Sequence, residues 1–161
     1  MFLPKSDMFK DLRQEAVHDI SQIAVEETHP REAVLFSTGE PATHFYLLVE
    51  GKVALTVGDR ASAHYTITRI GESFGWSSVV GRDAYSATAA CLAPTKVMKI
   101  DRAKLERVFD AHARSGRIFY KGLARAMGER WLDLHRTLMS ELEHTQAVSY
   151  GTGQITDIQE D

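Results

Sequence analysis

The first apolar pattern along the chain has helical spacing. The residues that share it are Phe9, Leu12, Ala16, Ile20 and Ile23. Acidic and other polar residues fill the positions between them, so the pattern predicts an amphipathic helix over residues 8–24. Pro30 removes a backbone donor and biases His29 toward extended geometry, so this element ends there at the latest.

The middle of the chain changes to short apolar or alternating runs, which are typical of strands. They lie at residues 33–36, 44–49, 52–57, 65–70, 85–91 and 96–100. Turn residues separate them, among them Gly39, Gly51, Gly58 and Gly71. Because no helical pattern intervenes, these runs predict an antiparallel β barrel or sandwich.

Helical spacing returns after Ile100. Asp101 suits an N-cap, and residues 102–109 predict a short helix. Ser115 and Gly116 indicate a break, and residues 117–144 then predict one long helix. Its coiled-coil-like seam, with spacings of four and three residues, comprises Tyr120, Ala124, Met127, Trp131, Leu134 and Leu138. A second stripe of Phe119, Leu123 and Ala126 is placed to pack against the barrel.

The predicted organisation is therefore a helical segment (1–24), a β-roll (25–100), lid and dimerisation helices (101–144) and a disordered tail (145–161). The seam extends over about six turns of 3.6 residues, farther than one small barrel reaches. We therefore expect it to form a homodimer. The alternative is that the seam folds back onto its own domain.

Three segments in this order resemble the cyclic nucleotide-binding domain family. They are 36–53 (FSTGEPATHFYLLVEGKV), 70–75 (IGESFG), and 84–89 (AYSATA) followed by 96–100 (KVMKI). The resemblance covers about residues 8–142. It implies a mainly β protein with flanking helices, an antiparallel double-stranded β-helix or jelly roll with an N-terminal helix and a long C-terminal helix. It also implies a regulatory, ligand-sensing role.

In that family a short helix presents backbone amides to the cyclic phosphate. A glutamate after the glycine binds the ribose, and an arginine at the next strand pairs with the phosphate. The glutamate position here is Trp76 and the arginine position is Tyr85. Losing a charge-assisted partner of the phosphate costs about 2–5 kcal/mol, so cAMP and cGMP should bind weakly. The candidate lining residues are Phe74, Gly75, Trp76, Ser77, Ser78, Arg82, Tyr85 and Ser86.

Each of these side chains has a second interpretation. Trp76 is either a stacking platform for a planar ligand or a plug that closes the pocket. Tyr85 either donates to an anion or is an ordinary strand residue. Arg82 either swings in to bind phosphate or is a solvated loop cation, and the serines suit an anion site but are also common at turns.

Composition narrows the function classes further. The net charge of -3 does not favour a nucleic-acid partner, and no DNA-binding half is recognisable. No apolar run is long enough to cross a bilayer, and the single cysteine favours the cytoplasm. Neither a metal site nor a catalytic constellation is apparent, so we expect no enzyme and no certain cofactor. A small anionic ligand, with cyclic nucleotide as one candidate, is the expected partner. The alternatives are a scaffold with a degenerate pocket and, more distantly, a haem-linked sensor.

Overall fold

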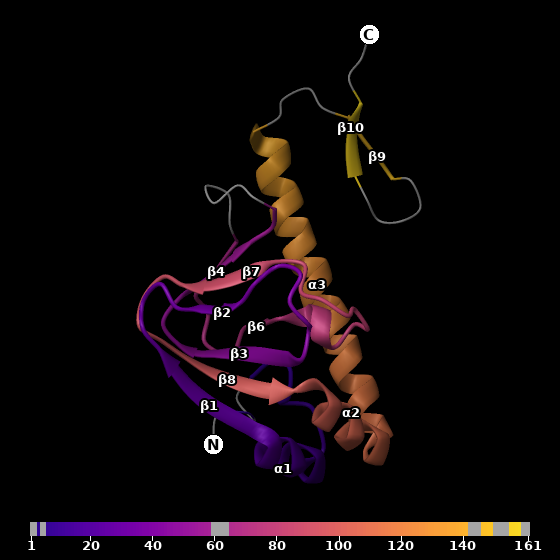
Figure 1. Ribbon diagram of the computed structural model, residues 1–161. Coiled ribbons are helices and arrows are strands. Elements are labelled where there is room, and N and C mark those ends of the chain that lie inside the picture. The colour runs from indigo at the N-terminus through magenta and orange to yellow at the C-terminus, as the bar shows by residue number, and fades with distance from the viewer. Residues whose placement is uncertain (1–2, 4–5, 59–64, 142–145, 150–154, 159–161) are drawn as a thin grey trace. The chain divides into compact units, whose positions relative to one another are not determined.

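Two four-stranded antiparallel sheets form the middle of the protein (Figure 1). The computed structural model describes residues 3, 6–58, 65–141, 146–149 and 155–158. One sheet has the order β1 (Ala24–His29), β8 (Thr95–Asp101), β3 (His44–Glu50), β6 (Ser73–Phe74), and the other β2 (Val34–Phe36), β7 (Thr88–Cys91), β4 (Val53–Thr56), β5 (Tyr65–Ile67). The sheets form two facing layers, which confirms the predicted jelly roll.

Each predicted run contains a strand, and two strands are three residues shorter than predicted: β5 ends at Ile67 in the run 65–70, and β7 is shorter at the start of the run 85–91. There β7 begins at Thr88. The backbone N–H of Tyr85 donates to Glu40 O, and Gly39 N–H donates to Tyr85 O, both at 2.9 Å. Because both backbone groups of Tyr85 are hydrogen-bonded to the turn at residues 39–40, Tyr85 does not belong to β7 as the sequence predicted.

The N-terminal helix is shorter than predicted. α1 spans Gln14–Ile23, and residues before it form tight turns such as that closed by Phe9 N–H on Ser6 O at 3.0 Å. Phe9 and Leu12 are nevertheless buried. Apolar residues at helical spacing can therefore be buried by successive turns as well as by a helix. β1 follows α1 directly and pairs with β8, with Ala24 opposite Ile100.

The predicted break at Ser115 and Gly116 is wrong. α2 spans Arg102–Ala111, and α3 runs without interruption over Ala113–Glu141. A Cβ at position 116 would lie 2.9 Å from Phe109 Cβ, so glycine is there for close packing against α2. Ser115 Oγ accepts a hydrogen bond from Arg13 N–H at 3.3 Å, which explains a buried serine in the first turn.

Contacts within the chain divide it into two units, Met1–Gly122 and Leu123–Asp161. The second contains the rest of α3 and an antiparallel hairpin of β9 (Gln146–Ser149) and β10 (Ile155–Ile158). This hairpin corrects the expectation of a disordered tail for those eight positions. The predicted end of the long helix at 142–144 and the other tail positions lie outside the described residues.

Aromatic rings fill two parts of the core of the first unit. Phe36, Tyr46, Phe74 and Tyr85 pack inside the roll, with neighbouring ring centroids 3.9–6.3 Å apart. Where the helices meet the roll, Phe119 packs with Phe9, Phe45 and Phe109. The contact between Phe119 and Phe45 of β3 confirms the prediction that Phe119 packs against the barrel.

Asp101 caps α2 as the sequence predicted: its carboxylate accepts a hydrogen bond from Lys104 N–H at 2.9 Å. Replacing Asp101 by alanine is expected to lower the free energy of unfolding by about 1 kcal/mol, because one amide loses its acceptor. Urea unfolding of Asp101→Ala beside Asp101→Asn checks this, since asparagine also caps helices. Equal losses in both variants would show that the cap is not the source.

Candidate functional site

The segment between β6 and β7, residues 75–87, is the candidate site and is called the cassette below. It begins with Gly75 in the left-handed conformation (φ 72°), followed by the short helix η2 (Trp76–Ser78). A Cβ at Gly75 would lie 3.0 Å from Tyr46 Cδ2 and 3.1 Å from His44 O. Both the backbone angle and the lack of space therefore require glycine at this turn.

Two of the three cassette serines, Ser77 and Ser86, bond to each other, and the third, Ser78, bonds to the backbone of the turn. Ser77 Oγ lies 3.3 Å from Ser86 Oγ and accepts from Ser86 N–H at the same distance. Ser78 Oγ donates to Gly75 O at 2.8 Å and is fully buried. A ligand could replace the long 3.3 Å contact between the Ser77 and Ser86 hydroxyls with hydrogen bonds of its own. The hydroxyl of Ser78 instead stabilises the turn at Gly75.

Trp76 is half-buried, and its indole is already anchored. Its Nε1–H donates to Ser73 Oγ at 2.9 Å, across one turn of chain. The bond fixes the orientation of the ring beside β6. It leaves both earlier interpretations, platform and plug, open to experiment.

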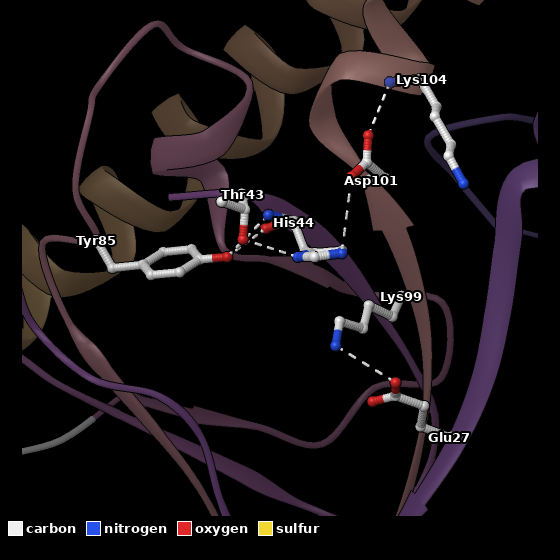
Figure 2. Close-up of polar contacts among 7 residues, drawn as sticks. All are labelled: Glu27, Thr43, His44, Tyr85, Lys99, Asp101 and Lys104. Atoms are coloured by element: carbon white, nitrogen blue, oxygen red, sulfur yellow. Dashed lines mark hydrogen bonds and ion pairs between the residues drawn. The ribbon is translucent and has the colours of Figure 1, made fainter. Parts of the chain in front are cut away.

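Tyr85 is a core residue. Its side chain is only 4% exposed, and its ring stacks on Phe36 with centroids 3.9 Å apart. The hydroxyl donates to His44 O at 2.8 Å and accepts from His44 N–H at 3.0 Å (Figure 2). Burial raises the pKa of Tyr85, although its bonds with the His44 backbone oppose the shift.

Arg82 is exposed, as are Gly81, Asp83 and Ser86 of the same segment. Its backbone N–H donates to Ser77 O at 3.2 Å, and its carbonyl accepts from Arg102 Nη1 at 3.1 Å. The backbone of Arg82 is thus fixed at both sides, while its guanidinium lies at the surface of the cassette. It is the cassette cation that an anion could meet.

His44 and its neighbours form a polar cluster that sequence analysis missed (Figure 2). The ring lies between Thr43 Oγ1, 2.8 Å from Nδ1, and Asp101 Oδ2, 4.0 Å from Nε2. Burial lowers the pKa of His44, helped by the nearby charge of Lys99 and opposed by Asp101. Because Tyr85 and His44 are 41 positions apart, no local pattern could have joined them.

Comparison with known proteins assigns the chain to a family. Residues 26–112, more than half of the chain, match the model of the cyclic nucleotide-binding domain. The chain belongs to the cyclic nucleotide-binding domain family. This is a regulatory fold of signal transduction.

Relatives within the family share the fold at modest identity. A predicted cyclic nucleotide-binding protein of Geobacter metallireducens is 27% identical, with a TM-score of 0.71 over 80% of this chain and 95% of that one. A cyclic nucleotide-binding domain of Methylobacillus flagellatus KT has a TM-score of 0.73 at 17% identity, covering 87% and 80%.

One curated relative is a predicted potassium channel protein of Rhodopseudomonas palustris. It is 30% identical over 98 residues, which are 61% of this chain but 24% of the relative. The chain thus spans about a quarter of the length of that protein. Among the helices that the structure describes here, none is long and apolar enough to cross a membrane.

The resemblance predicts that this chain departs from the family pattern at two positions of the cassette. Trp76 stands where the resemblance calls for glutamate, and Tyr85 where it calls for arginine. Both replacements are aromatic and both bond to the protein itself. The ring of Tyr85 joins the aromatic core instead of offering a charge.

Proposed function

We propose that this cyclic nucleotide-binding domain is a regulatory module that senses a small anionic ligand at its cassette and acts as a homodimer through α3. Of the predicted lining residues, Trp76, Arg82 and Ser86 would contact the ligand. The other members are buried and would support them: Phe74, Gly75, Ser77, Ser78 and Tyr85. The observation that carries the proposal is the bonded backbone of the cassette, which holds the exposed Arg82 on the same segment as the paired hydroxyls of Ser77 and Ser86. Neither catalysis nor a nucleic-acid partner forms part of the proposal.

The aromatic replacements set the affinity that we expect for cyclic nucleotides. Without a buried arginine at position 85, the phosphate loses about 2–5 kcal/mol of interaction. That corresponds to about two or three decades in Kd. Arg82 is the residue placed to recover part of this loss, because its side chain is exposed while its backbone is hydrogen-bonded on both sides.

Dimerisation through α3 rests on the exposed apolar seam. Of its six members, Trp131, Leu134 and Leu138 are 50%, 49% and 47% exposed. Trp131 stacks on His135 of the same helix, with centroids 5.0 Å apart, but half of its surface stays in contact with water. Large apolar side chains repeated at heptad spacing favour pairing with a second helix of the same kind.

A cytoplasmic location is also part of the proposal. The single cysteine, Cys91, is buried as a free thiol, and burial raises its pKa, which makes it a poor thiolate nucleophile. A chain with no disulfide to form is compatible with a reducing compartment.

Calorimetry with cAMP and cGMP tests the sensor directly. We expect binding in the high-micromolar to millimolar range and a further loss of about tenfold in Arg82→Ala, since a bond to a charged group contributes about 1.5–3 kcal/mol. Arg69→Ala is the matched control, because Arg69 is also exposed but pairs with Asp7 at 3.2 Å. The Arg69→Ala variant should bind cAMP and cGMP with the same affinity as the unmodified protein.

A second candidate function is an interaction scaffold with a degenerate pocket. The observation that favours it is the internal bonding of Trp76 and Tyr85, which leaves both side chains satisfied without a ligand. No heat with either nucleotide at millimolar concentration, together with an intact dimer, would favour the scaffold over the sensor.

A further inference from the structure

A titratable side chain, His135, lies beside the exposed apolar seam of α3. Its ring stacks on that of Trp131, with centroids 5.0 Å apart and an angle of 12° between the planes. Trp131 is a member of the seam and is 50% exposed, whereas His135 is partly buried. The stacking therefore holds an imidazole at the edge of the proposed dimer interface.

The part of α3 around His135 offers no carboxylate to a protonated ring. On a helix surface, the neighbours of a residue lie three and four positions away. For His135 these neighbours are all apolar and 39–50% exposed: Trp131, Leu132, Leu138 and Met139. Asp133 and Arg136, which are nearby in sequence, bond to each other at 3.3 Å. A positive charge on His135 would thus lie among apolar side chains.

The heptad register determines what His135 would meet in a dimer. With Trp131 and Leu138 at position a and Leu134 at position d, His135 occupies position e. In a parallel pair of helices, a side chain at e lies opposite one at position g of the other helix. The residue at that g position, in the heptad before, is Arg130 of the second copy.

This part of the seam contains basic residues but no acidic ones. Over residues 127–138, all of which the structure describes, positions a, d, e and g contain two ionisable side chains, Arg130 and His135. A neutral imidazole can be buried between the helices. A protonated one would lose water and face a like charge, and both effects disfavour the charged form in the dimer.

We propose that His135 makes the α3 dimer proton-sensitive: two chains associate while the imidazole is neutral and separate when it is protonated. This rests on the proposed function, whose homodimer it regulates. Histidine gains its charge as the pH falls from about 8 to about 5. Because separated chains bind protons that the dimer excludes, acidification favours the separated chains.

Sedimentation equilibrium of the full chain at about pH 8 and at about pH 5.5 tests this. We expect the dimer Kd to rise by about a hundredfold on acidification, about tenfold for each of the two histidines. His135→Gln cannot be charged and should form a dimer with the same Kd at both pH values. His135→Lys, which is charged throughout, should dimerise weakly at both.

His18→Gln is the matched control, because His18 is exposed on α1 and lies outside the seam. It should keep the pH dependence of the unmodified protein. A Kd that does not change with pH, or that changes equally in His135→Gln, would overturn the proton sensitivity while leaving the homodimer in place. A protein that is monomeric even at about pH 8 would instead overturn the homodimer itself, and this inference with it.

Discussion

Replacing Trp131 by glutamate is expected to halve the mass of the protein in sedimentation, from twice 18.0 kDa to the mass of one chain. In a symmetric pair of parallel helices each seam residue faces its own copy. Glutamate at position 131 would therefore place two carboxylates against each other and remove the largest apolar side chain of the seam. Both effects act against association.

Leu132→Glu is the matched control for this prediction. Leu132 is 43% exposed, close to the exposure of Trp131, and is the next residue of the same helix, but it lies outside the seam. The mass should stay that of a dimer. If Trp131→Glu leaves the mass unchanged, or if both variants dissociate equally, the seam is not the dimer interface.

Phe119→Ala is expected to lower the free energy of unfolding by about 3–5 kcal/mol, the range for deleting a buried phenylalanine ring. Phe119 is fully buried, and its ring contacts Phe9, Phe45 and Phe109, with centroids 4.8–5.5 Å apart. The cavity would thus open where the N-terminal turns, the roll and two helices meet. Urea unfolding measures the loss.

Val57→Ala provides the surface reference, because Val57 is 73% exposed and its truncation should change stability by less than about 0.5 kcal/mol. A loss in Phe119→Ala no greater than in Val57→Ala would contradict the packing described for the beginning of α3.

Much of the fold could be predicted from the chain because most strands carry their own signal. The run that became β3 is aromatic and aliphatic, and Gly51 follows it at φ 95°, where a Cβ would lie 2.5 Å from Pro94 O. β1 carries no such signal: it includes Glu26, Glu27 and Thr28, and its pairing with β8 defines it as a strand. Local composition cannot show a partner that lies 66–76 positions away.

Gly116 shows the same limit in a helix. Glycine is a common helix terminator, but here it allows Phe109 to approach α3, a requirement of tertiary packing. The hairpin of β9 and β10 escaped prediction because each strand is only four residues long and the tail also contains Gly151, Gly153 and scattered acids.

For the site, the sequence predicted a non-helical, turn-containing segment after Phe74, but it did not predict the packing of Tyr85. Its aromatic ring could equally have pointed outward from a strand. Only the folded chain brings it against Phe36 and the His44 backbone. Arg102 was likewise assigned to the lid without its bond to Arg82, since that contact depends on where α2 begins.

The most direct test of a sensing cassette is a titration of the protein with cAMP, followed through the amide signals of its nuclear magnetic resonance spectrum. We predict that the signals of Gly75, Ser77, Arg82 and Ser86 move progressively as the nucleotide reaches millimolar concentration, and that Arg82→Ala reduces the movement. Signals that stay fixed throughout the cassette at millimolar cAMP, or that move only elsewhere, would contradict the account.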